Sequence, residues 1–165
     1  MIFRLLTILT LAPVFCLSAC GPKPDNTAAS ASEPDAAGKV VADAVALPRT
    51  PSPDGARVFF ISPADGDTVS NPIHIEFGIE GMSVVKAGDK QPDSGHHHLL
   101  IDTAVPDPGA PVPADAHHVH FGDGSTATDI TLDPGQRTLR LLLADYLHIP
   151  HDPPVVSDPI TITVE

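Results

Sequence analysis

The chain has 165 residues and a formal net charge of −12, because 21 acidic side chains outnumber nine basic ones. This acidity argues against nucleic acids and anionic lipid surfaces as binding partners. It is compatible with the binding of cations, although acidic surfaces also serve solubility alone.

The first 19 residues are predicted to be a lipoprotein signal peptide. Arg4 supplies a positive charge, and the apolar run from Leu5 to Leu17 that follows it is too short to span a membrane. Leu17-Ser18-Ala19-Cys20 resembles the bacterial lipobox, which implies cleavage before Cys20 and attachment of lipid to this residue. An ordinary secretory signal with an incidental cysteine is the alternative.

The lipobox implies a protein of the bacterial cell envelope that reaches the membrane through its lipid anchor. Gly21, rather than an aspartate, follows the acylated cysteine. By analogy with enteric bacteria, this favours the outer membrane, with the protein facing the periplasm. Cys16 would leave with the signal and Cys20 would carry lipid, so the mature chain would have no thiol for a disulfide or a metal.

Residues 20–55 are predicted to be a disordered tether after the acylated cysteine. Prolines are spread through this segment among Ala, Ser, Asp and Gly, and large apolar side chains are almost missing. Such a composition cannot bury enough surface to offset the entropy of ordering. A folded domain is therefore expected to occupy residues 56–165.

Seven short segments of this domain have the apolar alternation of β-strands: Val58–Ile61, Ile73–Ile79, His97–Ile101, Val119–Phe121, Thr128–Leu132, Leu139–Leu143 and Ile160–Val164. Two segments rich in Pro, Gly and Asp, residues 81–95 and 103–116, are predicted as loops bordering the histidines. The pattern predicts an all-β fold, an immunoglobulin-like antiparallel β-sandwich of about seven strands. A jelly roll or another sandwich is the alternative, because the cysteines and tryptophan of antibody domains are missing.

Eight of the nine histidines fall into three clusters, at residues 96–98, 117–120 and 148–151. On a strand, residues i and i+2 share a face about 7 Å apart, so two imidazoles can lean onto one metal. The predicted ligands are His96, His98, His118, His120, His148 and His151. His97 is in step with Leu99 and Ile101, which leaves it open as a core residue or a ligand, and His74 is expected to face solvent.

Imidazoles without thiolate suit copper or zinc, with Cu(II) favoured by intrinsic affinity and Ni(II) also possible by chemistry. The clusters should converge on one face or end of the sandwich, and binding should weaken below about pH 6 as protons compete. Sequestration or transfer of this metal is the first functional prediction. The alternative is a structural or protein-interaction domain whose histidines only stabilise loops by hydrogen bonds to acceptors such as Asp102, Asp123, Asp145 and Asp152.

Catalysis is not predicted, since neither a Gly-x-Ser-x-Gly nor a His-Glu-x-x-His motif is present. A metal-dependent hydrolase would need an open metal position, with Asp102 or Glu76 as base. Two fragments of calcium loops, Asp65-Gly66-Asp67 and Asp123-Gly124-Ser125, lack the full ligand spacing and are predicted to form turns.

Several ordered motifs carry a family resemblance: Gly95-His96-His97-His98-Leu99-Leu100-Ile101-Asp102, His120-Phe121-Gly122-Asp123-Gly124, Leu132-Asp133-Pro134-Gly135-Gln136-Arg137-Thr138-Leu139 and His148-Ile149-Pro150-His151. Together they resemble the bacterial domain-of-unknown-function family 4399, over roughly Phe59–Glu165. The resemblance implies an exported bacterial domain, often lipid-anchored, with no activity attached to it.

Overall fold

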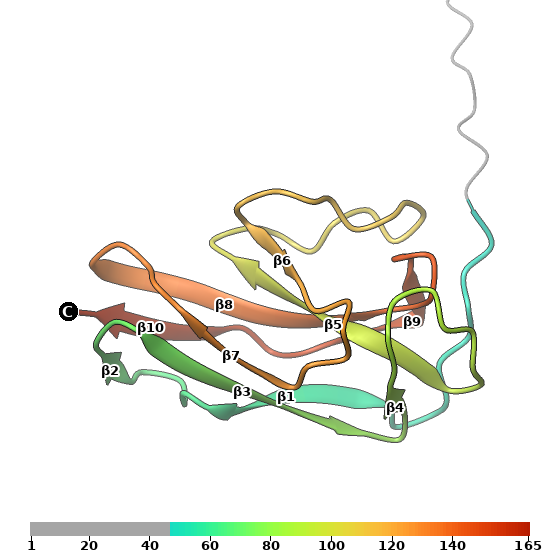
Figure 1. The fold of residues 1–165 in the computed structure, drawn as a ribbon, viewed down its shortest axis with the longest axis horizontal. Helices are drawn as coiled ribbons and strands as arrows, with labels where there is room; N and C mark the ends of the chain where they lie inside the picture. Colours follow the sequence, from blue (N-terminus) through green and yellow to red (C-terminus); the bar gives the residue numbers. More distant parts are fainter. Residues whose placement is uncertain (1–46) are drawn as a thin grey trace, which may run out of the picture. The chain divides into compact units, whose positions relative to one another are not determined.

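The computed structural model describes residues 47–165 (Figure 1). The predicted signal peptide, Cys20 and most of the predicted tether lie outside the described residues. No helix able to span a membrane occurs within the described part. Ten strands form there: β1 (Arg57–Ser62), β2 (Thr68–Val69), β3 (Ile73–Glu80), β4 (Ser83–Val84), β5 (Ser94–Ile101), β6 (His118–His120), β7 (Ala127–Ile130), β8 (Gly135–Ala144), β9 (Pro150–Val156) and β10 (Ile160–Val164).

The strands form two sheets, which confirms the all-β sandwich. One sheet has the order β1-β3-β7 and is antiparallel. The other has the order β2-β10-β8-β5-β4, with β6 paired to β5 and β9 paired to β8. It is mixed, because β2 lies parallel to β10 and β4 parallel to β5. All seven predicted segments are strands; β2, β4 and β9 are additional.

The main core lies between the two sheets and follows from period-two alternation. On β3, Ile73, Ile75 and Phe77 are buried, and the alternate residues His74 and Glu76 face solvent. They pack with Leu99 of β5, and with further apolar residues of β8 and β10, in one cluster. Each fully buried leucine or isoleucine contributes about 1.5–3 kcal/mol of transfer free energy, so this layer is the main source of stability.

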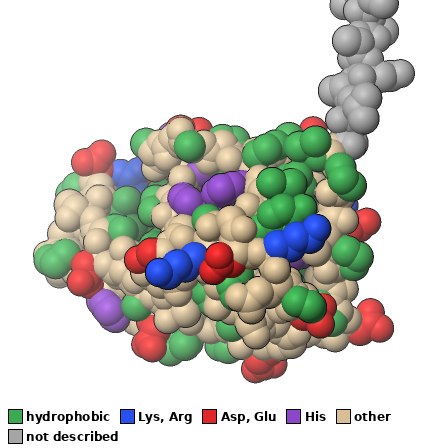
Figure 2. Space-filling model, turned by 45° about the vertical axis from the view of Figure 1, so that its right-hand side comes forward, with side chains coloured by type: hydrophobic (Ala, Val, Ile, Leu, Met, Phe, Trp, Pro, Cys, Tyr) green, Lys and Arg blue, Asp and Glu red, His purple; other side chains and the backbone are tan. Residues whose placement is uncertain are grey.

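The strand β5 is buried on both faces along its whole length. Its outward face carries Leu100, which packs with Leu142 and Ala144 of β8 and with Val112. Val112 belongs to the predicted loop of residues 103–116, which lies over this face above β5 in Figure 1. Histidine side chains come to the surface in this upper part of the molecule (Figure 2). Because β5 is buried on both faces, polar residues on its outer side are also enclosed by protein.

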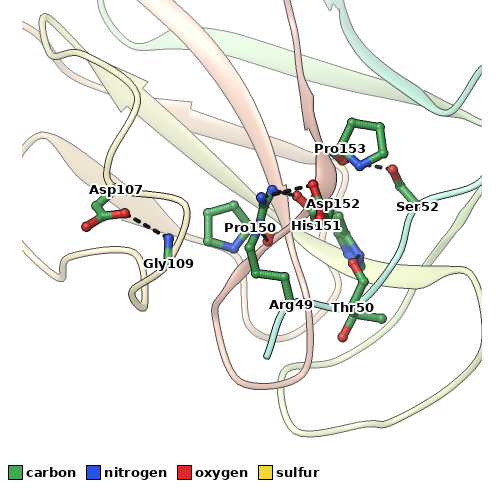
Figure 3. Close-up of polar contacts among 9 residues, drawn as sticks. All are labelled: Arg49, Thr50, Ser52, Asp107, Gly109, Pro150, His151, Asp152 and Pro153. Carbon is green, nitrogen blue, oxygen red and sulfur yellow. Dashed lines mark hydrogen bonds and ion pairs between the residues drawn. The ribbon is translucent and has the colours of Figure 1, made fainter. Parts of the chain in front are cut away.

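Residues 49–53, called the strap here, were predicted as tether but are paired with β9 (Figure 3). Ser52 N donates to Asp152 O at 3.0 Å, and Asp152 N donates to Thr50 O at 2.9 Å. The Arg49 guanidinium also donates to Pro150 O at 3.1 Å. The folded part of the chain therefore begins by residue 49, earlier than the predicted boundary at residue 56.

One predicted loop is shorter in the structure than the sequence indicated. Residues 81–95 were predicted as a loop, yet they contain β4 and the start of β5. Only a two-residue parallel ladder joins β4 to β5, with Ser83 opposite Ser94 and Val84 opposite Gly95. Such a short pairing leaves no period-two signal. The strand β9 gave no signal either, because prolines at positions 150, 153 and 154 normally confine a segment to a sheet edge.

Candidate metal centre

Alternation along β5 divides its three consecutive histidines between the two faces of the sheet. His97 points into the core, where its ring centroid lies 5.3 Å from that of Phe77. His96 and His98 point outward and are still buried, with 0% and 1% exposure. Their ring centroids are 4.9 Å apart. The open question about His97 is thereby answered in favour of the core.

Strand pairing brings a third histidine to the outward face. His120 of β6 lies directly opposite His98 of β5 in the antiparallel register. The two rings are stacked with their centroids 5.0 Å apart, and His120 lies at the same distance from His96. His120 is exposed, so it forms the rim of the site above a buried floor.

A fourth histidine reaches the same place from the turn between β8 and β9. The ring centroid of His148 lies 4.9 Å from that of His96 and 4.8 Å from that of His120. It is 6.0 Å from that of His98. His148 is half-buried and has a left-handed backbone, with φ of 66°. The residues His96, His98, His120 and His148 are called the four-histidine cluster below.

Three members of the cluster have nitrogens close enough to share one ion. His96, His98 and His120 each offer a ring nitrogen, and these three atoms lie within 4.8 Å of one another. Imidazole nitrogens bound to a tetrahedral zinc ion lie about 3.3 Å apart, because each is about 2 Å from the metal. Small side-chain rotations would close this difference.

Several of these nitrogens lack the partners that buried polar atoms need. Both ring nitrogens of His96 and Nδ1 of His98 are buried without a hydrogen bond. An unsatisfied buried polar group costs about 1–3 kcal/mol, so burial without partners calls for a compensating role. His97 also has two unpartnered nitrogens, but it faces an aromatic ring in the core and no second histidine.

Burial keeps these imidazoles neutral, which leaves a lone pair free for a metal. Desolvation, followed by the charges of His148 and His120, lowers the pKa of His96 to about 4. Desolvation, followed by the charge of His96, lowers the pKa of His98 to about 2. Desolvation also lowers the pKa of His120. Proton competition for a metal should thus begin below the pH of 6 expected from the reference pKa of imidazole.

Gly122 is a residue of the site that sequence reasoning missed. A Cβ atom at this position would lie 2.3 Å from Cε1 of His120 and 2.8 Å from its Nε2. The imidazole of His120 therefore occupies the space that any other residue at position 122 would fill. A glycine two residues after a predicted ligand was the available signal.

Two of the six predicted ligands make other contacts. Nδ1 of His118 lies 2.7 Å from Oδ1 of Asp115, in the loop that covers this face. Nδ1 of His151 lies 3.2 Å from Thr50 O in the strap, and its ring packs against Gly95. The structure thus brings together His96, His98, His120 and His148, and not His118 or His151.

The structure also shows the surroundings of the other polar residues considered in the sequence analysis. His74 is exposed as expected, with Nδ1 2.8 Å from Oδ1 of Asp129. Asp102 accepts hydrogen bonds from Arg137 Nη1 at 3.0 Å and from Thr138 N at 2.8 Å, and Glu76 is exposed on β3 in the other sheet. The aspartates of both calcium-like fragments accept backbone hydrogen bonds in turns, which confirms their turn role: Asp65 from Thr161 N, Asp67 from Ala64 N, and Asp123 from Ser125 N.

Comparison with known proteins gives a family without a function. No curated protein and no solved structure matches the chain. The model of the domain of unknown function DUF4399 matches residues 75–165, a stretch that contains all four members of the four-histidine cluster. This match covers more than half of the chain, as the sequence motifs predicted. The chain therefore belongs to the family of the domain of unknown function DUF4399.

Proposed function

We propose that this domain binds a transition metal, copper or zinc, through the four-histidine cluster, and that it sequesters or transfers this metal in the cell envelope. The observation that carries the proposal is the convergence of histidines from β5, β6 and the β8–β9 turn, with buried nitrogens that no protein group satisfies. Three separate chain segments supply these rings. A run of histidines within one segment would not by itself bring rings from the other two segments to the same place.

The chemistry of the donor set selects the metal. Neutral imidazoles suit Cu(II), Zn(II) and Ni(II), while Ca(II) and Mg(II) prefer hard oxygen ligands. The order of intrinsic affinities favours Cu(II), and four nitrogens also satisfy tetrahedral zinc. We therefore expect Cu(II) and Zn(II) to bind, with Cu(II) bound more tightly.

Binding fits the cluster better than catalysis does. A hydrolytic metal site keeps one position open for water and needs a base nearby. Here four imidazoles lie together. Of the two carboxylates considered as a base, Asp102 accepts hydrogen bonds from Arg137 and Thr138, and Glu76 lies on β3 in the other sheet. The proposed protein is a metal-binding lipoprotein rather than an enzyme. Lipid on Cys20 would anchor it, most simply in the outer membrane facing the periplasm.

A structural role for histidines has its own supporting observation. His117, His118 and His151 each hold a loop or segment by a hydrogen bond, to Ile101 O, Asp115 and Thr50 O respectively. A structural or protein-interaction domain of the envelope would need only such contacts. It would not need the four-histidine cluster, whose buried nitrogens it leaves unpaired.

Calorimetric titration of untagged protein with Cu(II), Zn(II) and Ca(II) would test the proposal, with plasma mass spectrometry of the purified protein beside it. We expect one equivalent of Cu(II) or Zn(II) to bind and Ca(II) not to bind. His120→Ala should weaken binding strongly without unfolding the domain, because His120 is at the exposed rim. His74→Ala is the matched control, since it removes an exposed histidine outside the cluster. Absence of Cu(II) and Zn(II) binding at neutral pH would leave the structural alternative.

A further inference from the structure

We infer that Thr50 and Asp145 are positioning residues for His148, so that docking of the strap on β9 completes the metal site. The inference rests on the proposed function, because it concerns the fourth ligand of the same site. It assigns a role to the strap, which was predicted to be part of the tether.

The turn that carries His148 is built around one buried carboxylate. Asp145 has 1% exposure, and its Oδ1 accepts hydrogen bonds from Leu147 N at 2.9 Å and from Ile149 N at 3.0 Å. The backbone of Asp145 closes the same turn, by accepting from His148 N at 2.9 Å and donating to Ile149 O at 2.9 Å. His148 itself has a left-handed φ of 66°, a backbone conformation that few non-glycine residues adopt.

The strap supplies the remaining partner of this carboxylate. Thr50 Oγ1 donates to Oδ2 of Asp145 at 2.6 Å. Arg49 donates to the other arm of the turn, at Pro150 O, His151 O and the Asp152 carboxylate. Figure 3 shows Arg49 and Thr50 lying beside residues 150–152. The strap thus contacts the chain on both sides of His148, at residue 145 and at residues 150–152.

These contacts couple the strap to the metal. With the strap docked, both oxygens of Asp145 are engaged and the turn holds His148 beside His96 and His120. With the strap displaced, Oδ2 of Asp145 would lose its partner, the turn would loosen, and the three histidines of β5 and β6 would remain as a weaker site. Loss of a partner that orients a metal ligand typically lowers affinity by about 10–100-fold. Displacement of the strap is therefore a route to metal release.

Thr50→Val and Thr50→Ser form the matched test in the mature chain. Valine keeps the shape of the side chain and removes the donor, while serine keeps the hydroxyl. We expect Thr50→Val to lower Cu(II) affinity about tenfold in a chelator competition, and to alter the nitrogen hyperfine pattern of the Cu(II) EPR spectrum toward that of His148→Ala. Thr50→Ser should retain both the wild-type affinity and the wild-type spectrum.

A double-mutant cycle with His148→Ala separates positioning from a general loss of stability. In the His148→Ala background, Thr50→Val should cause no further loss of Cu(II) affinity. Arg49→Ala, which loosens the strap without touching Asp145, should act in the same direction, and this second variant keeps the test open if Thr50→Val folds poorly. An equal loss in both backgrounds, or unchanged affinity and spectrum in both strap variants, would overturn the inference alone. Failure of the wild-type protein to bind Cu(II) would overturn the proposed function and this inference together.

Discussion

At the scale of single residues, the outer face of β5 carries two costs that an apolar face would not. His96 and His98 are desolvated, and their buried nitrogens lack hydrogen bonds. Leu100, on the same face, has neither cost and packs against Leu142. A domain selected only for stability would gain by replacing both histidines with apolar residues. The proposed metal would supply the partners that these nitrogens lack.

Gly122 gives a residue-scale prediction. Gly122→Ala should weaken metal binding, because the new Cβ would displace the ring of His120 from its seat. The domain should stay folded, since His120 is at the exposed rim. Calorimetric titration with Zn(II) measures the first effect and thermal unfolding the second. In a His120→Ala background the same substitution should leave Zn(II) binding unchanged; a further loss there would contradict the proposed steric cause.

The buried histidines of β5 predict how the stability of the metal-free domain depends on pH. Burial lowers their folded pKa values to about 4 for His96 and His97 and to about 2 for His98, all below the usual imidazole pKa of 6.5. Below pH 6.5 the unfolded chain therefore takes up protons that the folded chain does not. The stabilisation that depends on neutral imidazoles is complete above pH 6.5. It is lost as the pH falls toward each folded pKa, which is about 4 for His96 and His97 and about 2 for His98. Each histidine contributes a slope of at most about 1.4 kcal/mol per pH unit.

Urea unfolding at pH 7, 5.5 and 4.5 would measure this slope. His97→Leu is the informative variant, because it removes the one buried imidazole that faces Phe77 in the core. It should lower the pH dependence of the unfolding free energy by the contribution of one histidine and leave Cu(II) affinity unchanged. A slope unaffected by this substitution would show that His97 is not a source of the acid sensitivity.

At the scale of elements, alternation in the sequence predicted much of the fold and part of the site. It located all seven strands with period-two patterns, and it separated His97 from His96 and His98 because only one set could face the core. It paired His118 with His120 correctly as neighbours on one strand face. Alternation cannot give the register between strands, however, and register is what puts His120 opposite His98 and His118 opposite Leu100.

The contributions of the strap and of the β8–β9 turn to the site could not be predicted from the sequence, for a different reason. Composition made residues 49–53 look like tether, because prolines and small polar residues are common to linkers and sheet edges. Asp145 holds the turn around His148 through a local hydrogen bond from Ile149 N, while Thr50 reaches Asp145 from 95 residues away. The second contact joins residues so far apart in the chain that it leaves no mark in a local pattern.

A prediction at this scale concerns where the folded domain begins. A chain starting at Leu47 should match the stability of the mature protein. One starting at Asp54 should lose about 2–4 kcal/mol of unfolding free energy, because it lacks the strap's hydrogen bonds, each worth roughly 1 kcal/mol net. Denaturant unfolding of the two fragments would measure the difference. Limited proteolysis should likewise leave a resistant fragment that begins before Arg49; a resistant fragment starting at residues 55–58 with full stability would contradict the pairing on β9.

At the scale of the whole molecule, the proposed position in the envelope depends on one residue outside the described part. Cys20→Ser should prevent acylation and move the protein from the membrane fraction to the soluble fraction, because a lipid anchor is the only membrane attachment proposed. Immunoblotting of separated fractions would measure this shift. A soluble form with wild-type Cu(II) affinity would show that anchoring and binding are separate properties. Membrane association that persists in the processed variant would contradict the lipobox interpretation.

Because β5 is buried on both faces, the proposed metal site is separate from the core between the sheets. The hydrophobic core lies on one side of this strand, and the four-histidine cluster lies on the other, with His120 at its open rim. An ion can approach the cluster without any separation of the two sheets. Loading would then be a local event in a domain that is already folded, in contrast to small zinc domains that fold only around their ion. Under the proposed function, such a domain would fold empty and acquire its ion afterwards.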